Sequence, residues 1–202
     1  MTHDDFSRKN LTALPNLLTY LRMISIPIIL VVLAPPTTGY RMNVAFVLYV
    51  MASITDYLDG ILARRYDMVT SVGKLLDPLA DKLLTCGVLI MLIELDKVHG
   101  WVVFLIIGRE FTITGLRSIA ASQGLILDAS RMGKNKMVSQ TIALLFLLLH
   151  VPSLAYPLWL TGTVFLWISV ILGYWSAAGY FVDFYRKAKQ LQASRESART
   201  GP

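Results

Sequence analysis

Two pairs of aspartates at helical spacing stand in the stretch TDYLDGILARRYDMVTSVGKLLDPLADKLL, residues 55–84 of an otherwise largely apolar chain. Asp56 and Asp59 are three residues apart, and Asp77 and Asp81 are four apart, so each pair shares one face if its segment is helical. Two adjacent antiparallel helices would bring the carboxylates together, where they repel one another unless cations balance them. Carboxylate oxygens suit Mg²⁺ or Mn²⁺, and the pattern therefore predicts a divalent-metal site.

Small residues and one arginine accompany the aspartates. Gly60 directly follows Asp59, although glycine within a helix costs about 1 kcal/mol relative to alanine. A close approach by a ligand or by another backbone would offset that cost. Ala63 keeps the same face small one turn later, and Gly73 precedes the second aspartate pair. Arg64 carries a planar fork of donors that fits a phosphate, so these residues point to a phosphorylated substrate.

The composition is that of an integral membrane protein. Of 202 residues, 55% are hydrophobic and 16% are charged, with a mean hydropathy of +0.58, too apolar for a soluble domain of this length. The net charge of +6 comes without the basic and aromatic patch of a nucleic-acid binder, which favours lipid headgroups and phosphorylated substrates as partners. We predict an all-α protein with six transmembrane helices. The candidate spans are residues 14–35, 42–64, 75–96, 100–122, 134–152 and 157–186.

The positive charges predict the orientation of these spans. Arg41 and Lys97 are the basic residues of the connections on one side, and the larger group falls on the other side. That group is Arg8, Lys9, Arg64, Arg65, Lys74, Arg131, Lys134, Lys136, Arg186, Lys187, Lys189, Arg195 and Arg199. The positive-inside rule then places both termini and the aspartates at the cytoplasmic face. We expect a cytoplasm-facing polar active-site cavity in a membrane domain at 14–186, preceded by a cytoplasmic segment at 1–13 and followed by a polar tail at 187–202.

A second group of cations lies in the C-terminal half. Arg109 is deep in the fourth span beside Glu110, while Arg117, Lys134 and Lys136 gather around the cytoplasmic ends of the fourth and fifth spans. Such cations suit a phosphorylated acceptor, which a free alcohol would not require. Two simpler interpretations stay open: Arg109 and Glu110 form an internal ion pair, and the lysines serve topology alone.

Two further polar residues lie outside these groups. Arg22 in the first span either reaches a diphosphate or extends its stem to the cytoplasmic interface. His150 lies in a connection, and we expect it to be solvated, with no catalytic role.

The aspartate stretch resembles the complete signature of the CDP-alcohol phosphatidyltransferase family, with no departure at any defined position. The matching residues are Asp56-x-x-Asp59-Gly60-x-x-Ala63-Arg64 and, after eight intervening residues, Gly73-x-x-x-Asp77-x-x-x-Asp81. The resemblance implies two divalent ions held by the four aspartates, with Asp81 also serving as the general base. It further implies that the CDP group is bound by Asp56, Gly60, Ala63, Arg64 and Gly73.

Three looser segments, 14–27, 106–118 and 133–145, resemble family members whose acceptor is sn-glycerol 3-phosphate. This resemblance implies transfer of a phosphatidyl group from CDP-diacylglycerol to sn-glycerol 3-phosphate with release of CMP. It also implies a homodimer in the lipid bilayer of a bacterial inner membrane. With such an acceptor, we expect its phosphate to be held by the cations Arg109, Arg117, Lys134 and Lys136. The alternatives are the same chemistry with phosphatidylglycerol or an inositol phosphate as acceptor and, from another class, a cation transporter.

Overall fold

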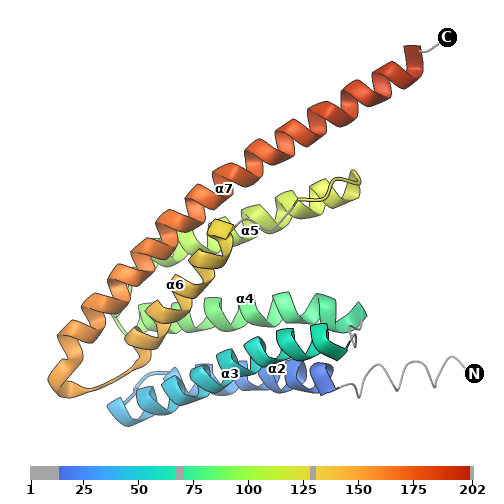
Figure 1. Ribbon diagram of the computed structural model, residues 1–202. Coiled ribbons are helices and arrows are strands. Elements are labelled where there is room, and N and C mark those ends of the chain that lie inside the picture. Colours follow the sequence, from blue (N-terminus) through green and yellow to red (C-terminus); the bar gives the residue numbers. More distant parts are fainter. Residues whose placement is uncertain (1–13, 67–70, 128–130, 201–202) are drawn as a thin grey trace, which may run out of the picture. The chain divides into compact units, whose positions relative to one another are not determined.

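A computed structural model describes the backbone of residues 14–66, 71–127 and 131–200, and side chains over 21–55, 79–127 and 132–191. Within these ranges the regular elements are all helical (Figure 1). They are α2 (Leu14–Leu33), α3 (Gly39–Tyr66), α4 (Ser71–Glu94), α5 (Gly100–Ser122), α6 (Arg131–Leu148), the short 3₁₀ helix η1 (Pro152–Leu154) and α7 (Ala155–Thr200).

Each of the six stretches predicted to span a membrane coincides with one α-helix, which confirms the all-α prediction. Over the described residues, one helical stretch, Pro152–Leu191, has the length and apolar composition of a membrane span, and Leu21–Leu33 forms a shorter apolar helix. The number of spans therefore stays a prediction.

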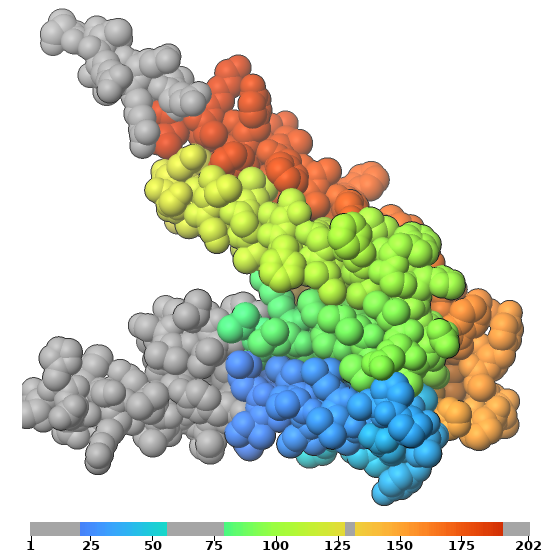
Figure 2. Space-filling view, turned by 180° about the vertical axis from the view of Figure 1, so that it is seen from behind, coloured from blue at the N-terminus to red at the C-terminus, as the bar shows by residue number. Residues whose placement is uncertain are grey.

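The helices group into two compact units. The first unit comprises residues 1–99 and 144–162, and in it α2 packs against both α3 and α4. Figure 2 shows α2 in blue against the described part of α4 in green. Gly87 lets the two helices approach closely, because a Cβ atom there would lie 3.0 Å from the Leu30 side chain. The fully buried side chains of this unit include Ile29, Leu33, Val88, Leu89, Leu92, Leu144, Leu147 and Leu148.

A polar contact ties the start of α3 to the connection that follows α6 in the first unit. The Asn43 amide donates to the His150 carbonyl at 3.0 Å, and its oxygen accepts from the His150 backbone N–H at 2.9 Å. The His150 ring fills the space beside Gly39, where a Cβ atom would lie 2.3 Å from ring carbon Cδ2. His150 is thus half-buried, so it is less exposed to solvent than the sequence led us to expect. The reason is the absence of a side chain at Gly39, which leaves room for the ring.

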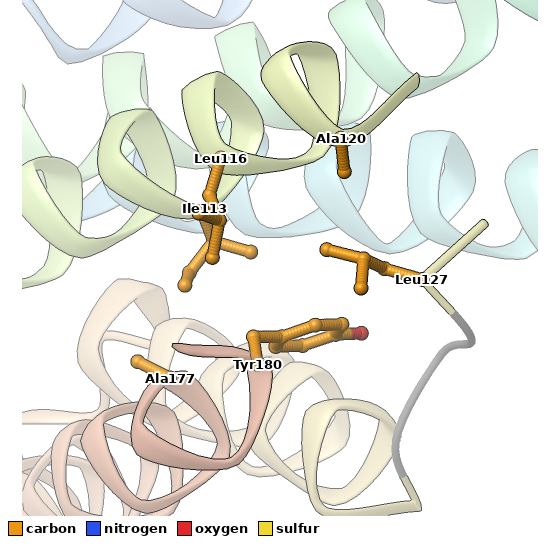
Figure 3. Close-up of a cluster of buried hydrophobic side chains, with 6 residues drawn as sticks. All are labelled: Ile113, Leu116, Ala120, Leu127, Ala177 and Tyr180. Atoms are coloured by element: carbon orange, nitrogen blue, oxygen red, sulfur yellow. The ribbon is translucent and has the colours of Figure 1, made fainter. Parts of the chain in front are cut away.

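The second unit comprises residues 100–143 and 163–202. Figure 3 shows its apolar cluster, which joins α5 and the connection after it to α7. The cluster consists of Ile113, Leu116, Ala120, Leu127, Ala177 and Tyr180. Polar contacts add to this packing. The Tyr174 hydroxyl of α7 donates to the Leu105 carbonyl of α5 at 3.3 Å, and Ser139 of α6 donates to the Phe165 carbonyl of α7 at 2.8 Å.

Helix α7 continues beyond the predicted membrane domain. The last predicted span ends at residue 186, whereas the helix runs to Thr200 and includes most of the polar tail. The tail is rich in lysine, arginine, glutamine, glutamate and alanine, which are strong helix formers. Helix formation therefore persists after the apolar pattern has ended.

We predict that Asn43→Ala destabilises the first unit. Loss of both hydrogen bonds leaves the His150 backbone groups without these partners, at a cost of about 1–3 kcal/mol. Thermal denaturation in detergent micelles should show a lower melting temperature than for Asn135→Ala, a matched change at an exposed position. Equal melting temperatures for the two variants would show that the contact contributes nothing.

Candidate functional site

The four predicted metal-binding aspartates lie on two consecutive helices of the first unit. Asp56 and Asp59 belong to α3, and Asp77 and Asp81 belong to α4, so the helical spacing assumed for each pair is present in the backbone. The two helices run in opposite directions (Figure 1). Asp81 is half-buried. The structure does not describe the side chains of Asp56, Asp59 and Asp77. That all four carboxylates lie close together therefore stays a prediction.

The residues predicted to bind CDP belong to the same two helices. Gly60, Ala63 and Arg64 lie on α3 after the first aspartate pair, and Gly73 lies in the first turn of α4. Their side-chain environment, like that of Asp56, lies outside the described residues. Where side chains are described, no three His, Cys, Asp or Glu residues stand close enough to share a metal ion.

Arg22 is a buried cation of the first unit, only 2% exposed. It therefore does not extend to the protein surface, which was one of its two sequence-based interpretations. Leu30 of α2 packs against Gly87 of α4. The two helices run in the same direction (Figure 1). Because both helices rise about 1.5 Å per residue, Arg22, eight residues before Leu30, is level with Leu79, between Asp77 and Asp81. The buried Arg22 thus belongs to a turn of α2 that lies about level with the acidic segment of α4.

The second unit brings together two of the four predicted acceptor residues. Arg109 Nη1 lies 2.8 Å from Glu110 Oε1, and Lys136 Nζ lies 2.5 Å from the same oxygen. The two cationic side chains are each 8% exposed and the Glu110 side chain is 18% exposed. Two cations and one carboxylate therefore form a nearly buried cluster with a formal charge of about +1 at neutral pH.

Helix α7 provides a third side of this cluster through Gly173. Its carbonyl accepts a hydrogen bond from Arg109 Nε at 3.0 Å. A Cβ atom at Gly173 would lie 3.6 Å from Lys136 Cγ and 3.7 Å from Arg109 Nε. Both cationic side chains therefore lie against the unsubstituted glycine, and α5, α6 and α7 meet at this point.

The other two predicted acceptor residues are placed differently. Arg117 is exposed, with its guanidinium 5.6 Å from the centre of the Tyr180 ring and Nη2 3.4 Å from the Leu127 carbonyl. It is eight residues after Arg109 on α5, about 12 Å along the helix axis. Lys134 is exposed, whereas Lys136 is buried. Residues two apart on a helix point to nearly opposite sides, so these lysines do not share a face.

Sequence reasoning paired Arg109 with Glu110 but missed that Lys136 joins the same carboxylate oxygen. Residues 110 and 136 belong to different helices, and no local spacing connects them. The available signal was the presence of an acid and two bases within apolar segments, since such charges are rarely tolerated there without partners.

Comparison with known proteins places this chain in a family. Residues 12–175 match the family model of CDP-alcohol phosphatidyltransferases, and the match includes both aspartate helices and the cation cluster. The CDP-diacylglycerol–glycerol-3-phosphate 3-phosphatidyltransferase of Bacillus subtilis is 37% identical, with 83% of this chain and 93% of the relative covered. The protein with the same name from Rickettsia bellii is 41% identical with the same coverage. A probable phosphatidylglycerophosphate synthase of Mycobacterium tuberculosis is 36% identical over 82% of this chain and 78% of its own. The chain belongs to the CDP-alcohol phosphatidyltransferase family.

Proposed function

We propose that this enzyme transfers a phosphatidyl group from CDP-diacylglycerol to sn-glycerol 3-phosphate, giving phosphatidylglycerophosphate and CMP. The observation that carries the proposal is the similarity to relatives named for this reaction, 37% and 41% identical over 83% of the chain. The intact aspartate signature and the buried pair of cations in the second unit agree with that reaction.

The proposed setting is a lipid bilayer, with six spans and both termini cytoplasmic in a bacterial inner membrane. Large apolar side chains exposed on successive helices support it, because soluble monomers rarely expose so much apolar surface. They include Val31, Met51, Phe104, Phe111, Ile171 and Trp175, each at least 60% exposed. The proposed membrane domain covers residues 14–186, and a homodimer is part of the proposal.

The aspartates of α3 and α4 fit a divalent-metal site by the chemistry of their donors. Helical spacings of three and four residues place each pair on one face, and carboxylate oxygens are preferred by Mg²⁺ and Mn²⁺. Asp56, Asp59, Asp77 and Asp81 would hold two such ions. When bound, the ions would offset the negative charge of the diphosphate and of the departing CMP.

The remaining chemistry is assigned to side chains of this protein. The acceptor hydroxyl oxygen forms a bond to the lipid-linked phosphorus while the bond from that phosphorus to the CMP oxygen breaks. Asp81 accepts the hydroxyl proton, and CMP leaves with the bonding electron pair. Arg64 donates to the diphosphate, while Asp56, Gly60, Ala63 and Gly73 bind the CDP group. The small residues leave space for its close approach.

The acceptor phosphate is assigned first to Arg109 and Lys136, which the second unit holds together and buries. Charge-assisted hydrogen bonds to a phosphate are strong where water is excluded. Arg117 and Lys134 are exposed, and as part of the proposal they attract the same phosphate from positions where water screens their charges.

An acceptor panel tests the function. Purified protein in detergent with CDP-diacylglycerol and Mg²⁺ or Mn²⁺ is given sn-glycerol 3-phosphate, an inositol phosphate or phosphatidylglycerol separately, and CMP is measured. We expect release with sn-glycerol 3-phosphate and its abolition by a chelator. Preference for another acceptor would refute the substrate assignment. Ion flux in proteoliposomes without CMP release would support the transporter.

We predict that Asp81→Asn lowers kcat by a factor of at least about 100, because the hydroxyl proton loses its acceptor. Binding of CDP-diacylglycerol should weaken less than turnover. Asp96→Asn, at an exposed position after α4, is the matched control and should keep normal kinetics. If lipid binding by Asp81→Asn fell as far as kcat, the residue would be a ligand without a role as base.

We predict that Lys136→Ala raises the KM for sn-glycerol 3-phosphate about 10- to 100-fold, the equivalent of roughly 1.5–3 kcal/mol. Arg117→Ala and Lys134→Ala should have smaller effects because both side chains are exposed. The KM for CDP-diacylglycerol should hardly change. Lys189→Ala, exposed near the end of α7, is the control. Unchanged acceptor kinetics in all three variants, with reduced insertion alone, would leave the cations a topological role.

A further inference from the structure

The cluster in the second unit contains a carboxylate that the proposed reaction does not use. Glu110 Oε1 accepts from both Arg109 Nη1 and Lys136 Nζ. Neighbouring residues of a helix diverge by about 100°, so the Arg109 side chain must turn back toward Glu110. The hydrogen bond from Arg109 Nε to the Gly173 carbonyl holds it in that orientation.

Removal of this carboxylate would leave two cations close together in a poorly solvated place. Like charges in such a setting repel, and each loses hydration that nothing replaces. Because both cations bond to the same oxygen, Glu110 also determines the separation between Arg109 and Lys136. The carboxylate thus compensates charge and defines geometry.

The cluster retains capacity for an anion. A guanidinium has five N–H donors and an ammonium has three. Among the described residues, Arg109 donates one hydrogen bond to the Gly173 carbonyl and one to Glu110, and Lys136 donates one to Glu110. The remaining donors and a formal charge of about +1 suit a phosphate group.

We propose that Glu110 is a positioning residue, which holds Arg109 and Lys136 at the spacing that receives the acceptor's phosphate. This inference rests on the proposed function, because it concerns the acceptor site of that reaction. Glu110 acts through the two cations and does not touch the substrate. A purely electrostatic account predicts the opposite effect of its removal, since the cluster would then carry a charge of about +2 and attract phosphate more strongly.

The kinetic test compares Glu110→Ala and Glu110→Gln with the wild-type enzyme. Glu110→Ala should raise the KM for sn-glycerol 3-phosphate about 10-fold or more, with kcat and the KM for CDP-diacylglycerol nearly unchanged. Glu110→Gln keeps an oxygen acceptor without its charge and should raise that KM about 3- to 10-fold. If Glu110→Ala does not fold, Glu110→Gln decides the question. Glu94→Gln, at an exposed position at the end of α4, is the matched control.

An unchanged acceptor KM in folded Glu110→Gln would overturn the inference, because a merely structural carboxylate affects the amount of folded protein and leaves the KM alone. A lowered KM would also overturn it and would identify Glu110 as a competitor of the phosphate.

A binding measurement separates this inference from the proposed function. Calorimetric titration with inorganic phosphate should give a dissociation constant about 10-fold higher for Glu110→Ala than for the wild type. If sn-glycerol 3-phosphate is not an acceptor but this loss of phosphate binding is seen, the positioning role stands and the acceptor assignment fails. If sn-glycerol 3-phosphate is turned over but both proteins bind phosphate equally, or the wild type binds none, the positioning role fails and the function stands.

Discussion

A charge removed from water must be compensated where it lies, and this constraint governs the polar residues of the largely apolar chain. In the second unit it is met by direct pairing, since one Glu110 oxygen bonds to both Arg109 and Lys136. Pairing alone seldom stabilises a fold, because the cost of desolvating the ions roughly equals their attraction. The presence of three charged side chains in a nearly buried cluster is therefore better explained by a task that requires them.

The same constraint operates in the first unit, with different elements. Helix α2 buries Arg22, in a turn that lies about level with the α4 segment between Asp77 and Asp81. Close packing makes this possible, because Gly87 allows Leu30 of α2 to approach α4. In the proposed enzyme, the buried Arg22 would add its positive charge to that of the two divalent ions that balance the carboxylates and the diphosphate.

The helices could be predicted because helix formation depends on residues that lie close together in the sequence. Long apolar stretches interrupted by glycine, proline and charged connections predicted the six helices, and the helical spacing assumed for the aspartates is present in α3 and α4. Prediction of the helix ends was weaker. Helix α7 extends to Thr200 because its polar residues favour a helix as much as apolar ones do, although the apolar pattern used to place its end stops at residue 186.

The amino-acid sequence was enough to predict the family and the helices that carry the aspartates, since the signature is a set of residue types at short spacings along one chain. Tertiary structure alone decided the partners of the isolated charges. It placed Lys136 with Arg109 on one carboxylate oxygen, directed Lys134 to the surface, set Arg117 against Tyr180 and buried Arg22. The physical reason is that helical periodicity determines which side chains share a face of one helix. Contacts between helices depend instead on how the helix surfaces pack. Small residues such as Gly87 and Gly173 determine how closely two helices can approach.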